Sequence, residues 1–150
     1  MIAIAVTLSI PAPTQAHDLD MSRETYGAIM PDQFYDDLGR CETGNPKGDL
    51  KHSTRSYTGA FGFYRGTAWR WSGHRDVSKL TRRQQITIVD RVAFVGWERP
   101  GKPKVWPVGP FGWGAITNGC GTMLEHLCQA RHPRVQKHRA RACRLAKELP

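Results

Sequence analysis

The sequence predicts a single α+β domain that is mainly helical, with a short loop and hairpin region and a basic helical extension at the C-terminus. Three observations support this prediction. Apolar residues recur at helical spacing after Pro31 and again after Thr81, a glycine-rich stretch separates these segments, and residues 131–150 combine basic side chains with helical periodicity. With 150 residues, of which 39% are hydrophobic, the chain has room for one modest core.

The N-terminus has the pattern of a secretory signal peptide. Residues 1–16 carry no charged side chain, contain an apolar run from Ile2 to Ile10, and end in Thr14-Gln15-Ala16. About ten apolar residues are too few to span a bilayer, so we expect a mature protein from about His17. A buried N-terminal strand is the alternative, and a start further upstream would explain why no basic residue precedes the run. Residues 17–32 are predicted to be a polar lead-in.

A first helix is predicted from Asp32 to Cys41, with Asp32 as its cap. Asp36 and Asp37 are expected on its solvated face. The segment from Thr43 to Tyr57 is rich in Gly, Asn and Pro and predicts a loop with a short hairpin. The apolar face of the helix is formed by Phe34, Leu38 and Cys41.

The stretch from Tyr57 to Trp69 places Gly59, Gly62 and Gly66 among aromatic residues. Glycines let a backbone approach a ligand closely, and flat side chains can stack on sugars. The simpler interpretation is that the aromatic residues are core, and we expect this of at least two of Phe61, Phe63 and Trp69.

A second helix begins at Thr81, where Thr81 and Gln84 form a capping box. We expect it to be the buried centre of the domain and to end near Gly96. The following Gly- and Pro-rich segment, up to Cys120, predicts a wrapped loop without regular helix. The buried face of the helix comprises Ile86, Val89, Val92, Ala93 and Gly96.

The net charge of +9 is concentrated at the C-terminus, where residues 131–150 carry seven Lys or Arg against the single acidic residue Glu148. Such a segment favours polyanionic partners, and for an exported protein we expect anionic wall polymers, with a membrane surface as the alternative. Nucleic acid is the weaker alternative, since no recognised binding motif accompanies the charge. A solvated helix packed by one apolar stripe also fits the spacing of Val135, Ala142, Leu145 and Leu149.

The four cysteines, Cys41, Cys120, Cys128 and Cys143, predict two disulfides in a chain that has the pattern of an exported protein. Three pairings are possible. We favour Cys128 with Cys143, which would link two short helices around Pro133, and Cys41 with Cys120. Zinc is the competing interpretation, but the Cys and His residues lack regular ligand spacing. Its ligands would come from His126, Cys128, His132, His138 and Cys143.

Glu42 is the candidate catalytic residue. It follows Cys41 where the predicted helix gives way to a loop at Gly44, so its side chain can be held by the helix and still face a cleft. Protonating a glycosidic oxygen requires a carboxylic acid that is partly shielded from water, so that its pKa rises toward the working pH. The alternative is an ordinary solvated glutamate.

Four motifs occur in a fixed order: Leu38–Asn45, Tyr57–Trp69, Thr81–Trp97 and Trp106–Val108. In this order they resemble the transglycosylase-like domain of actinobacterial resuscitation-promoting factors, over about residues 33–120. The resemblance implies a small lysozyme-like fold that cleaves the MurNAc-GlcNAc glycan of peptidoglycan. Residues 33–120 would then be the catalytic domain, and residues 121–150 a basic helical tail outside the resemblance.

The resemblance assigns the catalytic acid to Glu42 and a cleft position to Thr67, and we add Tyr57 and Trp69 as further substrate-binding candidates. It also implies a disulfide from Cys41 to a cysteine that follows the Trp-Pro-Val motif, of which the next is Cys120.

The chain departs from the family pattern at four positions. Gly62 and Val95 stand where the family carries Gln, Ala68 is inserted after Thr67, and Gly109 occupies the usual place of the second cysteine. The Cys41 to Cys120 pairing therefore requires an extra loop over residues 109–119.

Glycoside hydrolysis usually needs two carboxylates, about 5 Å apart or wider. The sequence offers only Asp37 and Asp49 near Glu42. A lytic transglycosylase manages with one Glu, because the N-acetyl group and C6 hydroxyl of the substrate take the nucleophilic roles, and we favour this mechanism. It requires no metal or organic cofactor. We expect a secreted or wall-associated monomer. The alternatives are a catalytically weak wall-binding or resuscitation module and a phage-derived lytic protein.

Overall fold

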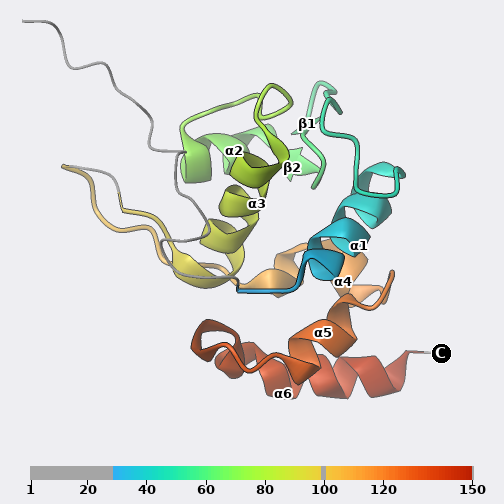
Figure 1. The fold of residues 1–150 in the computed structure, drawn as a ribbon. Helices are drawn as coiled ribbons and strands as arrows, with labels where there is room; N and C mark the ends of the chain where they lie inside the picture. The colour runs from blue at the N-terminus through green and yellow to red at the C-terminus, as the bar shows by residue number, and fades with distance from the viewer. Residues whose placement is uncertain (1–28, 99–100, 150) are drawn as a thin grey trace, which may run out of the picture.

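The computed structural model describes residues 29–98 and 101–149, so the predicted signal peptide and most of the lead-in lie outside the described residues. The domain is mainly helical with one small two-stranded sheet, which confirms the predicted class (Figure 1). Within the described ranges, no helix is long and apolar enough to cross a membrane.

Helix α1 spans Asp32–Thr43 and packs Phe34 and Leu38 into the core. The helix begins at Asp32 itself, with Pro31 as the N-cap, so the prediction that Asp32 caps it is wrong. A carboxylate in the first turn still favours the helix through the helix dipole. The helix ends at Gly44, whose φ of 86° lets its N–H donate to the Arg40 carbonyl at 2.8 Å.

The hairpin lies later in the chain than predicted. β1 (Tyr57–Thr58) pairs antiparallel with β2 (Phe63–Tyr64), whereas the segment from Thr43 to Tyr57 is mostly loop and contributes an isolated bridge from Ser53 to Thr58. A short helix that the sequence analysis did not anticipate follows directly, α2 (Arg65–Ser72). Its first turn contains Gly66 and Thr67, and Tyr64 provides no side-chain cap, so local propensity gives little signal. Burial of Ala68 and Trp71 stabilises it instead.

Helix α3 (Arg82–Asp90) runs through the middle of the domain and continues as the π-helical segment η2 (Arg91–Val95) (Figure 1). The Thr81–Gln84 capping box is present as predicted. Gly96 ends the segment with a φ of 83°. The face predicted to be buried is buried, with Ile86, Val89, Val92, Ala93 and Gly96 inside the protein.

The segment after η2 is more regular than the predicted wrapped loop. Trp97 and Val105 pair as an antiparallel bridge, and two short helices follow, η3 (Pro110–Gly112) and α4 (Gly114–Thr117). The prediction of no regular helix is therefore wrong for these residues. Burial of Trp113 and Ile116 anchors α4 in the core, which a reading of Gly and Pro content does not reveal.

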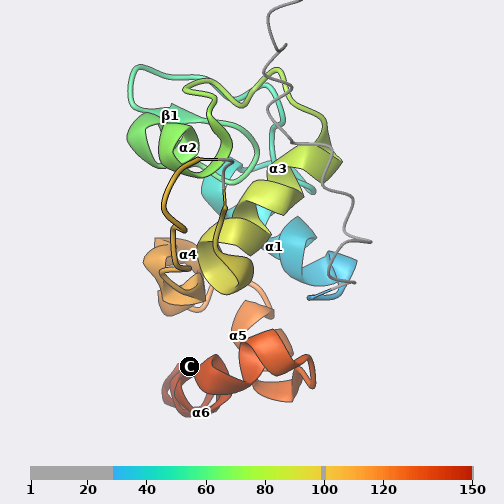
Figure 2. The same ribbon diagram turned by 90° about the vertical axis from the view of Figure 1, so that its left-hand side faces the viewer.

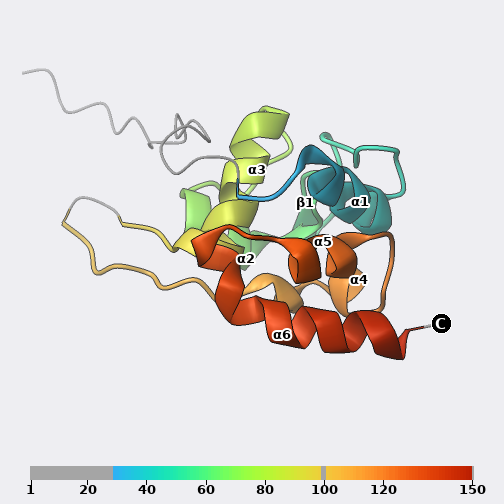
Figure 3. The same cartoon turned by 60° about the horizontal axis from the view of Figure 1, so that its bottom comes forward.

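Helices α5 (Met123–Gln129) and α6 (Pro133–Glu148) pack against each other on one side of the domain (Figures 2 and 3). The Cys128–Cys143 disulfide links them, as predicted. The basic side chains remain exposed, so α6 is a packed helix with a solvated cationic face. Five side chains of this layer join the common core: Met123, Leu124, Leu127, Val135 and Ala142.

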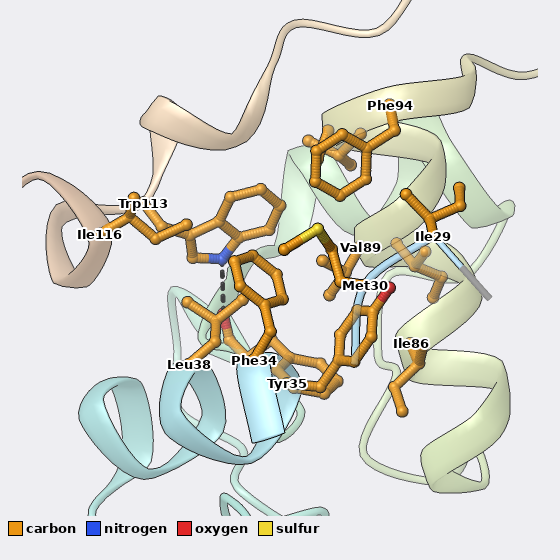
Figure 4. Close-up of a cluster of buried hydrophobic side chains, with 14 of the residues drawn as sticks. Ile29, Met30, Phe34, Tyr35, Leu38, Ile86, Val89, Phe94, Trp113 and Ile116 are labelled. Atoms are coloured by element: carbon orange, nitrogen blue, oxygen red, sulfur yellow. Dashed lines mark hydrogen bonds between the residues drawn. The ribbon is translucent and has the colours of Figure 1, made fainter. Parts of the chain in front are cut away.

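The core is one continuous cluster in which α1, η2 and the start of α4 meet (Figure 4). Ile29 and Met30 are buried within it, so the end of the predicted polar lead-in is structural. The Trp113 indole donates to the Phe61 carbonyl at 3.0 Å, which ties α4 to the glycine-rich turn between β1 and β2.

Gln85 is a fully buried polar residue on α3 with all of its hydrogen-bonding groups satisfied. Its Oε1 accepts from the Ala60 N–H at 2.7 Å. Its Nε2 donates to the carbonyls of Val77 and Leu80, at 2.9 and 3.1 Å, and to that of Leu50 at 3.2 Å. One side chain thus connects three loops to the central helix.

Replacing Gln85 with Leu is expected to lower the free energy of unfolding by about 2–4 kcal/mol, because several buried backbone groups lose their partners. Urea denaturation followed by circular dichroism measures this loss. The exposed Gln136→Leu is the matched control, and its effect should stay within about 0.5 kcal/mol. Equal stabilities of the two variants would contradict this role for Gln85.

Candidate active site

Glu42 lies in the last turn of α1, where three constraints fix the backbone. Gly44 ends the helix, and the Cys41–Cys120 disulfide anchors the preceding residue. The Gly39 and Ala60 carbonyl oxygens, at 3.0 and 3.1 Å, share the single proton of the Thr43 hydroxyl. The predicted Cys41–Cys120 pairing is thus present. A helix end held in this way gives the carboxylate a defined position.

The Glu42 carboxyl is half-buried and has one hydrogen-bond donor, the Ala115 N–H, 3.4 Å from its Oε1. Burial raises the pKa of Glu42, and the Ala115 hydrogen bond opposes this only in part. The raised pKa favours the protonated acid, which is the form that can donate a proton to a leaving group.

A cleft of about 400 Å³ opens beside Glu42. The hairpin and α2 form one wall, and residues 108–114 with Val92 form the other. Among the described residues that line it, Glu42 carries the single carboxylate. The lining consists of Glu42, Tyr57, Gly62, Phe63, Tyr64, Thr67, Val92, Val108, Gly112, Trp113 and Gly114.

Three of the four predicted site residues meet in this cleft: Glu42, Thr67 and Tyr57. Tyr57 and Tyr64 are exposed and stand edge to face, with ring centroids 6.1 Å apart. Exposed rings beside polar groups are suited to contact sugar faces. The cleft thus combines an acid, a hydroxyl and aromatic surface.

Trp69 does not line this cleft. It is 45% exposed in a separate groove that it shares with Arg70 and with Trp106, which is 72% exposed. Phe61 and Phe63 are buried, in agreement with the expectation that at least two of the three aromatic residues are core. Residues Thr67 and Trp69 project differently because two successive steps along a helix turn the side chain by about 200°.

Asp37 is not solvated, contrary to prediction, because only 3% of it is exposed. Its Oδ2 accepts from the Thr122 hydroxyl at 2.8 Å, and its Oδ1 pairs with Arg40 at 2.7 Å. Burial alone would raise the pKa of Asp37, but the hydrogen bonds from Thr122 and Gln33 and the charge of Arg40 outweigh it, and the pKa is lowered. Asp37 therefore links α1 to the start of α5.

The other acidic residues near α1 also have structural partners. Asp36 forms an ion pair with Arg82 of α3. Asp49 accepts from the Lys51 N–H at 3.0 Å, and its own N–H donates to the Thr43 hydroxyl at 2.7 Å. Neither lines the cleft.

The segment from Gly109 to Gly119, which the sequence required to be an extra loop, supplies much of the second cleft wall. It contributes Gly112, Trp113 and Gly114 to the lining, and the Ala115 N–H to Glu42. Sequence reasoning missed Trp113 as a cleft residue. Its position between two short glycine-bounded turns gives no periodic signal.

Gly62, one of the departures from the family pattern, lies against the acid. Its φ is 58°, and a Cβ at this position would stand 2.9 Å from Glu42 Oε2. The glycine therefore leaves space for the Glu42 carboxylate. Val95, the second departure, packs against the core and adds no polar group.

Replacing Gly62 with Ala is expected to displace the carboxyl of Glu42, the predicted catalytic acid, and thereby to lower the predicted glycan-cleaving turnover by about 10–100-fold, because small misplacements of a catalytic group are costly. Backbone strain should also lower stability by about 1–2 kcal/mol. Gly101→Ala is the control, since Gly101 has a φ of 71° but no neighbour within 4 Å. If both variants keep full activity on peptidoglycan, Gly62 does not position the acid.

The zinc interpretation loses two of its ligands, because Cys128 and Cys143 form a disulfide. In the described part of the chain, no group of three or more His, Cys, Asp or Glu side chains could hold a metal ion.

Comparison with protein-family models, with curated proteins and with solved structures found no match to the chain.

Proposed function

We propose that the protein is a peptidoglycan-cleaving glycosidase of small lysozyme-like fold, acting as a lytic transglycosylase on MurNAc-GlcNAc linkages. The observation that carries the proposal is a single half-buried glutamate with a raised pKa in a cleft lined by tyrosines and a threonine. The resemblance of four ordered motifs to resuscitation-promoting factors supports the same activity.

In the proposed reaction, Glu42 protonates the glycosidic oxygen as the bond from that oxygen to C1 breaks, and the substrate's N-acetyl group stabilises the positive charge at C1. The resulting Glu42 carboxylate then removes the proton from the C6 hydroxyl of the same sugar. That oxygen attacks C1 and forms an anhydro ring. Glu42 thus donates one proton and recovers one, so it ends the reaction protonated as it began, and no water is consumed.

The absence of a second acid from the described lining of the cleft favours this route over hydrolysis, which usually needs two carboxylates. Thr67 is proposed to hydrogen-bond the substrate, and Tyr57 with Tyr64 to contact sugar faces. Trp69 lines a separate groove with Arg70 and Trp106, so it is not assigned this role.

We also propose that the protein is secreted or associated with the cell wall. Two disulfides fit an oxidising compartment. The exposed basic side chains of α6 are proposed to hold the enzyme on anionic wall polymers, through binding that weakens as salt increases.

The deciding experiment digests purified peptidoglycan in water labelled with heavy oxygen and identifies the products by mass spectrometry. A lytic transglycosylase yields anhydro-muropeptides without label. A hydrolase yields reducing ends that carry the label, which would overturn the proposed mechanism. Wall binding without any cleavage would favour instead a binding module with a degenerate site, the alternative suggested by Gly62 and Val95.

A further inference from the structure

A second cavity, of about 490 Å³, lies between residues 108–112 and helix α6. It shares Val108 and Gly112 with the cleft that contains Glu42, so the two hollows adjoin along one wall. Lys137, His138 and Arg141 of α6 form the opposite side. This part of the chain lies outside the motifs that resemble resuscitation-promoting factors.

The cavity is cationic. Lys137 and Arg141 are four residues apart on α6, so they lie on the same face of the helix. None of the described residues that line the cavity is acidic. Two positive charges without a neutralising partner in the lining favour an anionic ligand group.

The cationic side is held in place by aromatic contacts. The Arg141 guanidinium lies 4.3 Å from the centroid of the Phe111 ring. His138 stands edge to face against Phe94 and Phe111, with centroid distances of 6.2 and 5.9 Å. Gly109 makes room for this imidazole, because a Cβ there would lie 3.1 Å from its Cε1. Such packing pre-orders a binding site before the ligand arrives.

We propose that this cavity binds a carboxylate of the peptide substituent carried by the glycan strand that occupies the cleft, with Lys137 and Arg141 as specificity-determining residues. The inference rests on the proposed function. The shared wall favours a group on the same strand over a separate wall polymer, and a guanidinium binds carboxylates through paired hydrogen bonds. The enzyme would thereby prefer peptide-bearing glycan to bare glycan.

The test measures binding of the full chain to sedimented wall material in the Glu42→Gln background, so that the ligand is not consumed. Two ligands are compared. One is peptidoglycan freed of other wall polymers, and the other is the same material stripped of its peptides by an amidase, with the lactyl carboxylates that this hydrolysis exposes then converted to amides. The variants are Lys137→Gln with Arg141→Gln, and the control is Arg144→Gln with Lys147→Gln, which removes the same charge outside the cavity.

The Glu42→Gln protein and the Arg144/Lys147 control should bind peptide-bearing material about tenfold more tightly than stripped material. The Lys137/Arg141 variant should lose this preference. Circular dichroism verifies that the variant is folded, and Arg141→Lys should keep part of the preference. Equal losses in the variant and the control, or no difference between the ligands, would overturn the inference. A Lys137/Arg141 variant that keeps its preference for peptide-bearing material and loses only its binding to phosphate-rich wall polymer would also overturn it.

Binding selectivity is measured without turnover, so its result is separate from that of the cleavage assay. A protein that binds selectively and cleaves nothing contradicts the proposed enzyme but keeps the carboxylate site. A protein that cleaves both ligands equally, with or without Lys137 and Arg141, keeps the enzyme and loses the site.

Discussion

Replacing Glu42 with Gln is expected to lower the turnover of peptidoglycan by about 10²–10⁴-fold, the range typical of losing a positioned general acid. The amide keeps the shape of the side chain and can still accept the Ala115 hydrogen bond, but its N–H protons are not acidic enough to be transferred to the leaving oxygen. The measurement is the rate of muropeptide release at constant wall concentration, with binding to the wall followed in parallel. Binding should persist, because the cleft lining is otherwise unchanged.

The pH dependence of the wild-type rate gives a second signature of the same residue. The acid must be protonated, and burial raises the pKa of Glu42, so activity should fall as pH rises through that raised value. The folded protein also favours the protonated form of Glu42. The stability that this preference contributes is fully present below the unfolded-state pKa of Glu42 and is lost as pH rises through its raised folded-state pKa. Glu42→Gln should therefore be at least as stable as wild type at neutral pH.

Asp49→Asn is the matched control for Glu42→Gln, since it removes a nearby carboxylate that does not line the cleft. Its rate should remain within a few-fold of wild type. A Glu42→Gln variant that releases muropeptides at the wild-type rate would exclude Glu42 as the acid. Loss of activity in the Asp49 variant alone would indicate that the catalytic acid is Asp49, in the loop that follows α1, and not Glu42.

The sequence predicts those parts of the fold that have a local physical cause. The Thr81–Gln84 capping box and the spacing of Ile86 and Val89 predict α3, because both depend on residues a few positions apart. The position of Glu42 is predictable for the same reason, since Glu42 lies one helical turn after the core residue Leu38 and Gly44 ends the helix two residues later.

Features that depend on distant partners could not be predicted. The local sequence around Asp37 predicts a surface carboxylate, because its hydrogen-bond partner Thr122 is 85 positions later in the chain. Gln85 has no local signal of burial, because its partners come from three separate loops. Helix α2 has weak propensity and forms through the burial of Trp71.

The candidate site shows the same division. Thr67 and Tyr57 are predictable from their motif, and both line the cleft. Trp69 belongs to the same motif, but the unpredicted α2 helix turns its side chain into another groove. The Ala115 N–H and Trp113 come from a segment without periodicity, so only the folded chain brings them to Glu42.

Removing the Cys41–Cys120 disulfide with Cys41→Ser and Cys120→Ser is expected to lower the free energy of unfolding by about 4–5 kcal/mol. The cysteines are 79 residues apart, and the chain-entropy model assigns a larger effect to a longer closed loop. The Cys128–Cys143 disulfide closes a 15-residue separation, for which the same model gives about 3 kcal/mol. Urea denaturation of this variant and of the variant with Cys128→Ser and Cys143→Ser, without reducing agent, measures the two losses of unfolding free energy.

The two disulfides should also differ in their effect on activity, because Cys41 adjoins Glu42 and Cys120 follows the cleft wall that donates the Ala115 N–H. Loss of the first disulfide lets both sides of the acid move, whereas the second joins α5 to α6 away from the cleft. Turnover per folded molecule should therefore fall in the Cys41/Cys120 variant and remain near wild type in the Cys128/Cys143 variant. Equal turnover per folded molecule would mean that the first disulfide stabilises the fold without positioning Glu42.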